Sequence, residues 1–280
     1  MNSSPTPSSS ALRVAFIGGG NMAGAIIGGL VRQGLPADRI DVVEPFDETR
    51  DKLSRQWPIH THAAASPALA RADIVVWAVK PQIMKEAAAQ TRAHVQRALH
   101  LSVAAGIPTD SLAAWLGSER IVRCMPNTPA LVGQGMSALF ARASVTAEER
   151  AQVEQVLRPT GELLWVQDEA QIDAVTALSG SGPAYVFYFL EAMTRAGTEM
   201  GLPADQAYRL AVGTFAGASA LARASDEAPD VLRQRVTSRG GTTYAAITSM
   251  EGDRVGPLFE RALHAARQRA EELGREFGAA

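Results

Sequence analysis

A run of glycines near the start of the chain is the first segment whose residue types could do chemistry. It follows a short apolar stretch and consists of Gly18, Gly19, Gly20, Asn21 and Met22, with an alanine next, which fits the pattern G-x-G-x-x-A. In this pattern the first glycine permits a tight turn, and the second lets the backbone approach a pyrophosphate at the N-terminus of the next helix. The spacing predicts a dinucleotide-binding turn rather than a plain glycine turn.

Two charged residues bear on the kind of dinucleotide. Glu44 stands 26 residues after Gly18, at the end of a second apolar stretch. An acid near this position commonly accepts a hydrogen bond from the ribose 2′-hydroxyl of NAD and repels the 2′-phosphate of NADP. Glu44 therefore favours NAD, although it could also be a solvated acid in an acidic loop. Arg50 could reach a phosphate from the following helix, so NADP stays an alternative cofactor.

A turn with a lysine follows a third buried stretch. The run DIVVWAV (73–79) leads into Lys80 and Pro81, and the run LHLSV (99–103) leads into small residues that would let a flat ring lie close. Ligands of parallel sheets bind beyond the carboxyl ends of the strands, so both loops should face the cofactor. Lys80 then belongs to the site, and the alternative is an ordinary solvent-facing lysine.

Two glycine-rich turns lie in the second half of the chain. Residues 179–184 (SGSGPA) open a helical stretch, with Ser181 placed as an N-cap and Pro183 in the first turn. The free N–H groups and dipole of such a helix would suit a carboxylate, and ordinary capping is the alternative. Residues 237–243 (TSRGGTT) form a second turn between helices, which supplies hydroxyls and free amides but no strong acid or base.

The segment 123–129 (RCMPNTP) combines two prolines with an asparagine and a threonine. This composition predicts a rigid, polar turn rather than a helix. On its own the segment is interpreted as a structural connection. Cys124 within it has no neighbouring base, so a buried thiol is favoured over a nucleophile.

The distribution of lysine and histidine limits the chemistry of the second half. Lysine occurs only at Lys52, Lys80 and Lys85, and the second half has a single histidine, His264. A catalytic lysine or a His–Asp pair, as many hydroxy-acid dehydrogenases use, is therefore hard to build there. A nicotinamide enzyme without an evident proton donor suggests an electrophile that needs none, such as a protonated C=N bond.

The composition of the whole chain is that of a globular protein with a large core. Its 280 residues are 46% apolar with a formal net charge of −2, which excludes a disordered chain and gives no reason to expect nucleic acid or a membrane as partner. The single cysteine cannot form an internal disulfide or a cysteine-rich zinc site, so no metal is expected and a cytoplasmic location is predicted. Residues 1–10 are predicted to be a disordered tail rather than a signal peptide.

Apolar stretches and helical patterns alternate in the first part of the chain. The predicted strands are residues 13–18, 39–43, 73–79, 99–103 and 121–125. The predicted helices between them include residues 22–33, 82–98 and 109–116. This alternation predicts a doubly wound parallel sheet. From about residue 168 the chain is helix-forming, so we expect one domain at 11–167 and a helical one at 168–280.

With these pieces together, the sequence resembles the pyrroline-5-carboxylate reductases, which catalyse the last step of proline biosynthesis. The likeness rests on the segments FIGGGNMAGAI, VVWAVKPQ, SVAAGI, RIVRCMPNTPALVGQGM, ALSGSGPAYVF and VTSRGGTTYAAITSME. It implies an α/β Rossmann domain followed by an all-α dimerisation domain whose helices interlock between two subunits, with decamers of dimers in some members. It also implies hydride transfer from NAD(P)H to a cyclic imino acid.

The resemblance assigns roles to individual residues. The dinucleotide would be held by Ile17, Gly18, Gly19, Gly20, Asn21, Met22, Ala78, Val79, Lys80, Pro81, Ala104 and Ala105. The substrate would be held by Ser179, Gly180, Ser181, Gly182, Pro183, Gly240, Gly241, Thr242 and Thr243, the last four coming from the partner subunit. Thr243 aligns with the threonine thought to hydrogen-bond the pyrroline nitrogen, so Thr243 and Lys80 are the catalytic candidates.

Other functions stay open on the residues alone. A β-hydroxyacid dehydrogenase of similar build would want a catalytic lysine in the helical domain, and none follows Lys85. A non-catalytic NAD(P)-binding regulator is a different class, and the intact SGSGPA and GGTT turns argue against it. Many members of the resembled family have a small polar residue at Glu44 and prefer NADPH, so NADP and NAD both remain. The six-membered piperideine analogue stays an alternative substrate.

Overall fold

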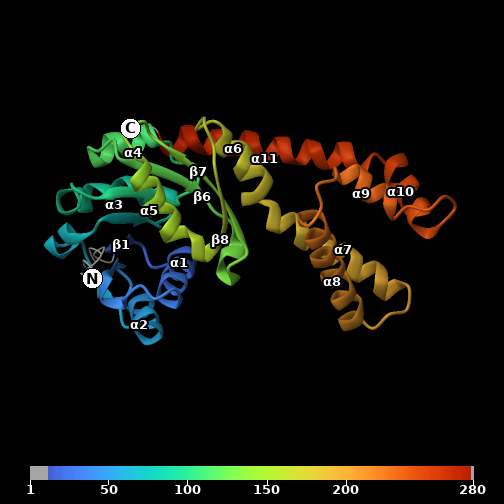
Figure 1. Cartoon of the computed structure of the whole chain (residues 1–280), viewed down its shortest axis with the longest axis horizontal. Helices are drawn as coiled ribbons and strands as arrows, with labels where there is room; N and C mark the ends of the chain where they lie inside the picture. Colours follow the sequence, from blue (N-terminus) through green and yellow to red (C-terminus); the bar gives the residue numbers. More distant parts are fainter. Residues whose placement is uncertain (1–11, 279–280) are drawn as a thin grey trace, which may run out of the picture. The chain divides into compact units, whose positions relative to one another are not determined.

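Residues 12–278 of the chain are described by a computed structural model, and in this range eight strands form one sheet (Figure 1). The strands are β1 (Val14–Ile17), β2 (Ile40–Val43), β3 (His60–His62), β4 (Ile74–Trp77), β5 (Leu99–Ser102), β6 (Ile121–Met125), β7 (Gly135–Ala141) and β8 (Gly161–Trp165). Their order is β3-β2-β1-β4-β5-β6-β7-β8, and only β6 and β7 pair antiparallel. Because β1 lies between β2 and β4, the winding reverses there, which is where such sheets bind ligands.

Helices cover both faces of this sheet (Figure 1). They are α1 (Asn21–Arg32), α2 (Asp47–Gln56), α3 (Met84–Thr91), α4 (Thr109–Leu116) and α5 (Ala147–Leu157). Along β1, Val14 and Phe16 pack in one core with residues of α1, α2 and α5, whereas Ala15 and Ile17 pack in a second core with residues of α3 and α4. Both faces of the strand are therefore buried, which explains its unbroken apolar sequence and confirms the predicted doubly wound sheet.

The rest of the chain is helical, as predicted. Its helices are α6 (Gln171–Val175), α7 (Gly182–Glu199), α8 (Ala204–Arg223), α9 (Pro229–Arg235), α10 (Thr242–Gly252) and α11 (Val255–Gly278). The chain forms two compact units, one of residues up to 180 together with those from 266 onward, and the other of residues 181–265. This division by contacts falls later than the predicted domain limit at 168, which stays a prediction.

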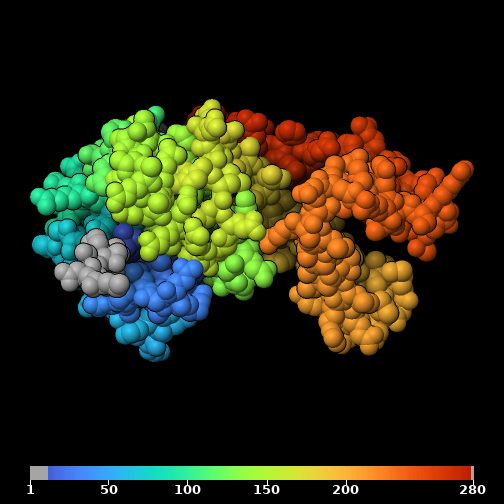
Figure 2. Space-filling view, viewed as in Figure 1, coloured from blue at the N-terminus to red at the C-terminus, as the bar shows by residue number. Residues whose placement is uncertain are grey.

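The second unit exposes many large apolar side chains. Among them are Phe187 (58% exposed), Leu210 (60%) and Leu221 (71%), and Figure 2 shows the surface of this unit in orange tones. Tyr185 and Phe189 instead make edge-on ring contacts with Phe259 inside the unit, at 5.6 and 5.8 Å between centroids. Contiguous apolar surface is rare on monomers and common at permanent subunit interfaces. The exposure therefore fits a helical unit that another chain covers.

Three strands of the described part were not predicted, and one predicted helix is shorter in the structure. β3 has only three residues, two of them histidines, and β8 alternates between half-buried and exposed positions, so neither shows an apolar run. β7 is built largely from small residues. The helix expected at 82–98 is α-helical only at Met84–Thr91, between 3₁₀ turns at Pro81–Ile83 and Arg92–His94. The predicted tail at 1–10 lies outside the described residues.

A buried polar pair joins β4 to β5. Trp77 Nε1 donates a hydrogen bond of 3.2 Å to His100 Nδ1, and both side chains are almost fully buried. Burial lowers the pKa of His100 to about 4, and the positive charge of Arg120 adds to the effect. The imidazole is therefore neutral in the folded protein at neutral pH, as it must be for Nδ1 to accept the indole N–H.

We predict that acid destabilises the fold through His100. The unfolded chain takes up a proton there below the ordinary pKa of 6.5, whereas the folded chain resists protonation down to about pH 4. The contribution of neutral His100 is complete above pH 6.5 and is lost as the pH falls from 6.5 to about 4, by up to about 3 kcal/mol of unfolding free energy. Urea unfolding at a series of pH values measures this loss.

The matched control is His100→Asn, which keeps an acceptor for the indole and does not titrate. The stability of the wild type relative to this variant should decline over that pH range. A difference that stays constant with pH would show that His100 is not the titrating group.

Candidate active site

The carboxyl ends of three strands meet at Gly18. The N–H of Gly18 donates to the oxygen of Val43 on β2 (2.8 Å), and the N–H of Ala78 after β4 donates to the oxygen of Ile17 on β1 (2.8 Å). Gly18 has a φ of +96°, and a Cβ there would lie 2.6 Å from the carbonyl oxygen of Ala78. Only glycine accommodates both the left-handed backbone and this close approach. The first glycine of the predicted turn is thus fixed by backbone crowding.

Glu44 holds the same turn from the side of β2. Its buried carboxylate accepts hydrogen bonds from the N–H groups of Gly19 (2.8 Å) and Phe46 (3.0 Å). Arg50 donates to the backbone oxygens of Glu44 (2.6 Å) and Pro45 (2.8 Å). The guanidinium of Arg50 therefore closes the loop after β2, and the alternative that it also reaches a phosphate stays a prediction.

The amino end of α1 offers N–H groups to a ligand. Gly20 stands at the N-cap, no side chain caps the helix, and its first turn holds no acidic residue. Such a helix end carries unpaired N–H groups and partial positive charge, which bind anions such as a pyrophosphate. A Cβ on Gly20 would meet no atom within 4 Å, so there is open space over the turn. These features fit a dinucleotide.

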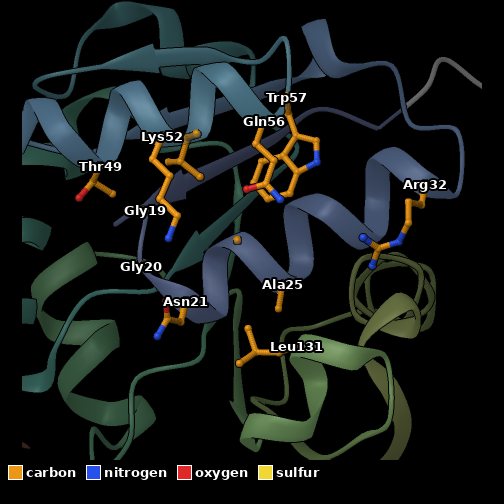
Figure 3. A pocket seen from close by; sticks show the side chains of 12 residues that line it. Gly19, Gly20, Asn21, Ala25, Arg32, Thr49, Lys52, Gln56, Trp57 and Leu131 are labelled. Atoms are coloured by element: carbon orange, nitrogen blue, oxygen red, sulfur yellow. The ribbon is translucent and has the colours of Figure 1, made fainter.

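A groove of about 320 Å³ starts at this turn and runs beside α1 (Figure 3). Its other wall is formed by Thr49 and Lys52 of α2 and by Trp57. In Figure 3 the side chain of Lys52 extends from α2 toward the glycine turn. A lysine at this place can neutralise a phosphate. Sequence reasoning did not select Lys52, because a lysine on an exposed helix has no distinctive spacing.

The turns after β4 and β5 lie at the same edge of the sheet as Gly18. β1 pairs with β4 and β4 with β5, all in parallel, so their carboxyl ends are neighbours. The N–H of Val103 donates to the oxygen of Trp77 (3.1 Å), and Ala104 beside it is buried. Lys80 is exposed at the start of a 3₁₀ turn. The structure brings the predicted cofactor-binding turns together, while the catalytic part of Lys80 stays a prediction.

An ion-pair network anchors α6 to the sheet. The buried Arg123 on β6 contacts Glu169 (3.0 Å) and Asp173 (3.5 Å). Glu169 also accepts hydrogen bonds from the N–H and the hydroxyl of Thr109 (2.7 and 2.5 Å). Burial raises the pKa of Asp173 although Arg123 opposes the shift. Arg123 is therefore committed to these acids, and it fixes the helix that leads to the SGSGPA turn.

The SGSGPA turn joins two helical segments. Ser179 and Gly180 end the π-helical stretch Thr176–Gly180, and Gly182 begins α7. Ser181 occupies the N-cap position, as predicted, but its hydroxyl makes no capping hydrogen bond. Pro183 lies in the first turn, also as predicted. Pro183 has no N–H, and the N–H of Ala184 donates to the oxygen of Ser181 (3.0 Å). The expected carboxylate site at this helix start therefore stays a prediction.

The GGTT segment is a second helix start. Gly240 has a φ of +77°, the N–H of Gly241 donates to the oxygen of Ser238 (3.0 Å), and Thr242 and Thr243 already belong to α10. The expectation of a turn up to residue 243 was therefore wrong for its last two residues. Thr243 is half-buried in the second unit, and its role toward a substrate stays a prediction.

Two residues set aside in the sequence analysis are poorly placed for catalysis. Cys124 is buried, which confirms a buried thiol, and burial raises its pKa to about 12. His264 is exposed on α11.

Among residues 12–278, no three His, Cys, Asp or Glu side chains are grouped so that they could hold a metal ion. No helix in the same range combines the length and apolar character that a membrane span requires.

The fold and the turns define a class of protein: a dinucleotide-binding α/β domain followed by helices, as in nicotinamide-dependent oxidoreductases. Comparison with family models agrees with this class. A model described as NADP oxidoreductase, coenzyme F420-dependent, matches residues 13–106. A model described as pyrroline-5-carboxylate reductase dimerisation matches residues 169–273.

Individual relatives identify the family. A pyrroline-5-carboxylate reductase of Pseudomonas aeruginosa is 50% identical over 95% of this chain and 98% of its own length. A solved pyrroline-5-carboxylate reductase of Coxiella burnetii, 38% identical, superposes with a TM-score of 0.88 over 94% of this chain and 99% of that one. A Plasmodium falciparum pyrroline carboxylate reductase with NADP bound, 27% identical, gives 0.83 over 94% and 98%. The chain belongs to the pyrroline-5-carboxylate reductase family.

We predict that replacing the first glycine of the turn lowers stability, whereas replacing the third glycine weakens binding of the dinucleotide. Gly18→Ala should lower the unfolding free energy by about 2 kcal/mol or more, because its backbone is strained at positive φ and its methyl group meets Ala78. Gly20→Ala meets no atom, so its stability should match the wild type while its methyl group obstructs a bound pyrophosphate. Thermal unfolding with and without NADP separates the two effects. Equal stability of the two variants would contradict this account of the turn.

Proposed function

We propose that this protein reduces L-Δ1-pyrroline-5-carboxylate to L-proline, with NADPH or NADH as the hydride donor. One observation carries the proposal. The dinucleotide turn at α1 occurs together with the SGSGPA and GGTT turns at two further helix starts, in a chain 50% identical to a pyrroline-5-carboxylate reductase. The name shared with relatives from Haemophilus influenzae and Arabidopsis thaliana supports the substrate.

The chain's task toward the dinucleotide is to bind and orient it, while the reduced nicotinamide supplies the hydride. The N–H groups at Gly20 and Asn21 would hold the pyrophosphate. The turn after β4 and the small residues Ala104 and Ala105 would border the nicotinamide ring. The relative with NADP bound supports NADP, and the carboxylate of Glu44 beside the turn supports NAD.

The substrate carries a carboxylate and a ring with a C=N bond. Residues 179–183, which match the family's SGSGPA segment, would receive the carboxylate. The GGTT turn of the partner subunit would lie against the ring, with the hydroxyl of Thr243 accepting a hydrogen bond from the ring N–H. Two subunits would then complete each site.

The helical half provides no evident general acid. Lysine is absent after Lys85, and the exposed His264 is the only histidine in that half. We therefore expect the substrate to arrive as the iminium, so that hydride addition to the ring carbon needs no proton from the protein. Lys80 would assist at the nicotinamide end.

A homodimer and a cytoplasmic location belong to the same proposal. The match to a dimerisation model and the exposed apolar side chains of α7 and α8 support the dimer. Assembly of dimers into decamers stays an expectation from the family. The single cysteine fits a reducing compartment.

The proposal predicts oxidation of NAD(P)H by the purified protein when pyrroline-5-carboxylate is added. Thr243→Ala should lower kcat/KM about tenfold to a hundredfold, the effect of one orienting hydrogen bond, and leave the shape of the pH profile unchanged. Ser144→Ala, which also removes one hydroxyl, at an exposed loop position where that hydroxyl donates to the backbone oxygen of Glu119, is the control. Absence of turnover with both cofactors would refute the function. Loss of one limb of the pH profile in Thr243→Ala would make Thr243 an obligatory acid instead.

The cofactor preference gives a separate prediction. Glu44→Ser should raise kcat/KM for NADPH relative to NADH about five- to tenfold, because it removes a negative charge that repels the 2′-phosphate. Glu44→Gln is the matched variant, since its amide oxygen can still accept the Gly19 N–H. Steady-state kinetics with both cofactors measure the ratio. A wild type that already has a much lower KM for NADPH than for NADH would contradict the repulsion.

A further inference from the structure

The groove beside α1 carries positive charge that no acid of its own offsets. Among the described residues that line it are Lys52 of α2 and Arg32 at the end of α1, but no aspartate or glutamate. Within residues 12–278, no hydrogen bond or ion pair joins the ammonium group of Lys52 to another side chain. A groove lined by one sign of charge attracts a ligand of the opposite sign, here an anion.

Lys52 stands beside the same glycine that Glu44 holds. A Cβ on Gly19 would lie 3.3 Å from Cγ of Glu44 and 2.7 Å from Cδ1 of Leu53. Lys52 precedes Leu53 on α2 and lines the groove together with Gly19. In Figure 3 the side chain of Lys52 extends toward this turn. Glu44 and Lys52 therefore flank one glycine, the first from the end of β2 and the second from α2.

The position next to Glu44 indicates which phosphate of a dinucleotide Lys52 would meet. In dinucleotide-binding folds the acid after the second strand marks the 2′ position of the ribose, and a basic residue nearby accommodates the 2′-phosphate of NADP. The pyrophosphate instead lies at the N–H groups that begin the first helix, here at Gly20 and Asn21. The place of Lys52 beside Gly19 thus fits the 2′-phosphate.

The other two cations of α2 are engaged elsewhere. Arg50 donates to two backbone oxygens of the loop after β2 and pairs with Asp47. The side chain of Arg55 is 81% exposed, lies 3.9 Å from Asp51 and does not line the groove. Lys52 is therefore the cation of this helix that combines a place in the groove with a free ammonium group.

We propose that Lys52 binds the 2′-phosphate of NADP(H) and so sets the cofactor preference of this chain. The inference rests on the proposed function, which places the dinucleotide at the glycine turn. Glu44 and Lys52 then act on NADPH in opposite directions, since the carboxylate repels the 2′-phosphate and the ammonium group attracts it. Both oxygens of Glu44 already accept N–H groups, from Gly19 and Phe46, which reduces the repulsion that Lys52 has to offset.

The test compares NADP⁺ with NAD⁺, which differ only in the 2′-phosphate. Lys52→Gln removes the charge from the full chain and keeps a polar side chain. NADP⁺ should bind about tenfold more weakly in calorimetry, while the Kd of NAD⁺ stays within about twofold. KM for NADPH should rise by the same factor, and KM for NADH should not. Lys52→Arg keeps the charge and should keep the preference for NADP⁺ over NAD⁺.

The matched control is Arg55→Gln, which removes one positive charge from the same helix outside the groove. Salt screens an exposed charge that makes no direct contact with the ligand. Both Kd values should therefore stay within about twofold of the wild type.

The two cofactors separate the possible outcomes. An unchanged Kd for NADP⁺ in Lys52→Gln overturns the proposal. Equal weakening of NADP⁺ and NAD⁺ also overturns it, because Lys52 would then act on the pyrophosphate that both share. The same loss in Arg55→Gln would reduce the effect to the net charge of α2 and overturn it too. A wild type that selects NADP⁺ through Lys52 but does not reduce pyrroline-5-carboxylate refutes the proposed function and leaves the role of Lys52 standing.

Discussion

The missing side chain of Gly18 is the constraint on which the candidate site depends. Here the N–H of Gly18 donates to the end of β2, the N–H of Ala78 after β4 donates to the neighbouring Ile17, and the carbonyl oxygen of Ala78 lies too close to leave room for a Cβ on Gly18. The close approach brings the turn before α1 next to the turn after β4. The two turns proposed to bind the dinucleotide are therefore backbone segments that the sheet holds rigidly.

Glu44 has a structural role at the position that is proposed to set the cofactor preference. Its two oxygens accept N–H groups on either side, from the glycine turn and from the loop after β2, and Arg50 closes that loop by binding its backbone oxygens. A change of cofactor preference at this position therefore also changes how the turn is supported. Arg50, which on the sequence alone is an alternative phosphate ligand, stabilises a loop in this structure.

The parts that the sequence predicted are those encoded by local pattern. Five strands appear in the sequence as apolar runs because both of their faces are buried; these are β1, β2, β4, β5 and β6. The glycine turns are recognisable from their composition. β3 and β8 were not predicted, because exposed positions interrupt the apolar run that would mark them as strands. The glycine turn, Glu44 and Lys80 were selected from spacing, whereas the substrate and the residues that would hold it came from resemblance. The contact between Asn127 and Ser179 could not be predicted from spacing, since the two residues lie 52 positions apart and only tertiary folding brings them together.

The last helix has a consequence for how this chain must be made. α11 starts in the helical unit, but its final residues belong to the first unit. There the hydroxyl of Ser111 donates to the oxygen of Gly278 (2.6 Å), and Leu273 lies against Gly106. The helical unit is therefore an insertion within a domain that the two ends of the chain close. During synthesis the ribosome releases the whole sheet before the helix that completes it, so the first unit of a nascent chain stays unfinished until the residues from 266 onward have emerged.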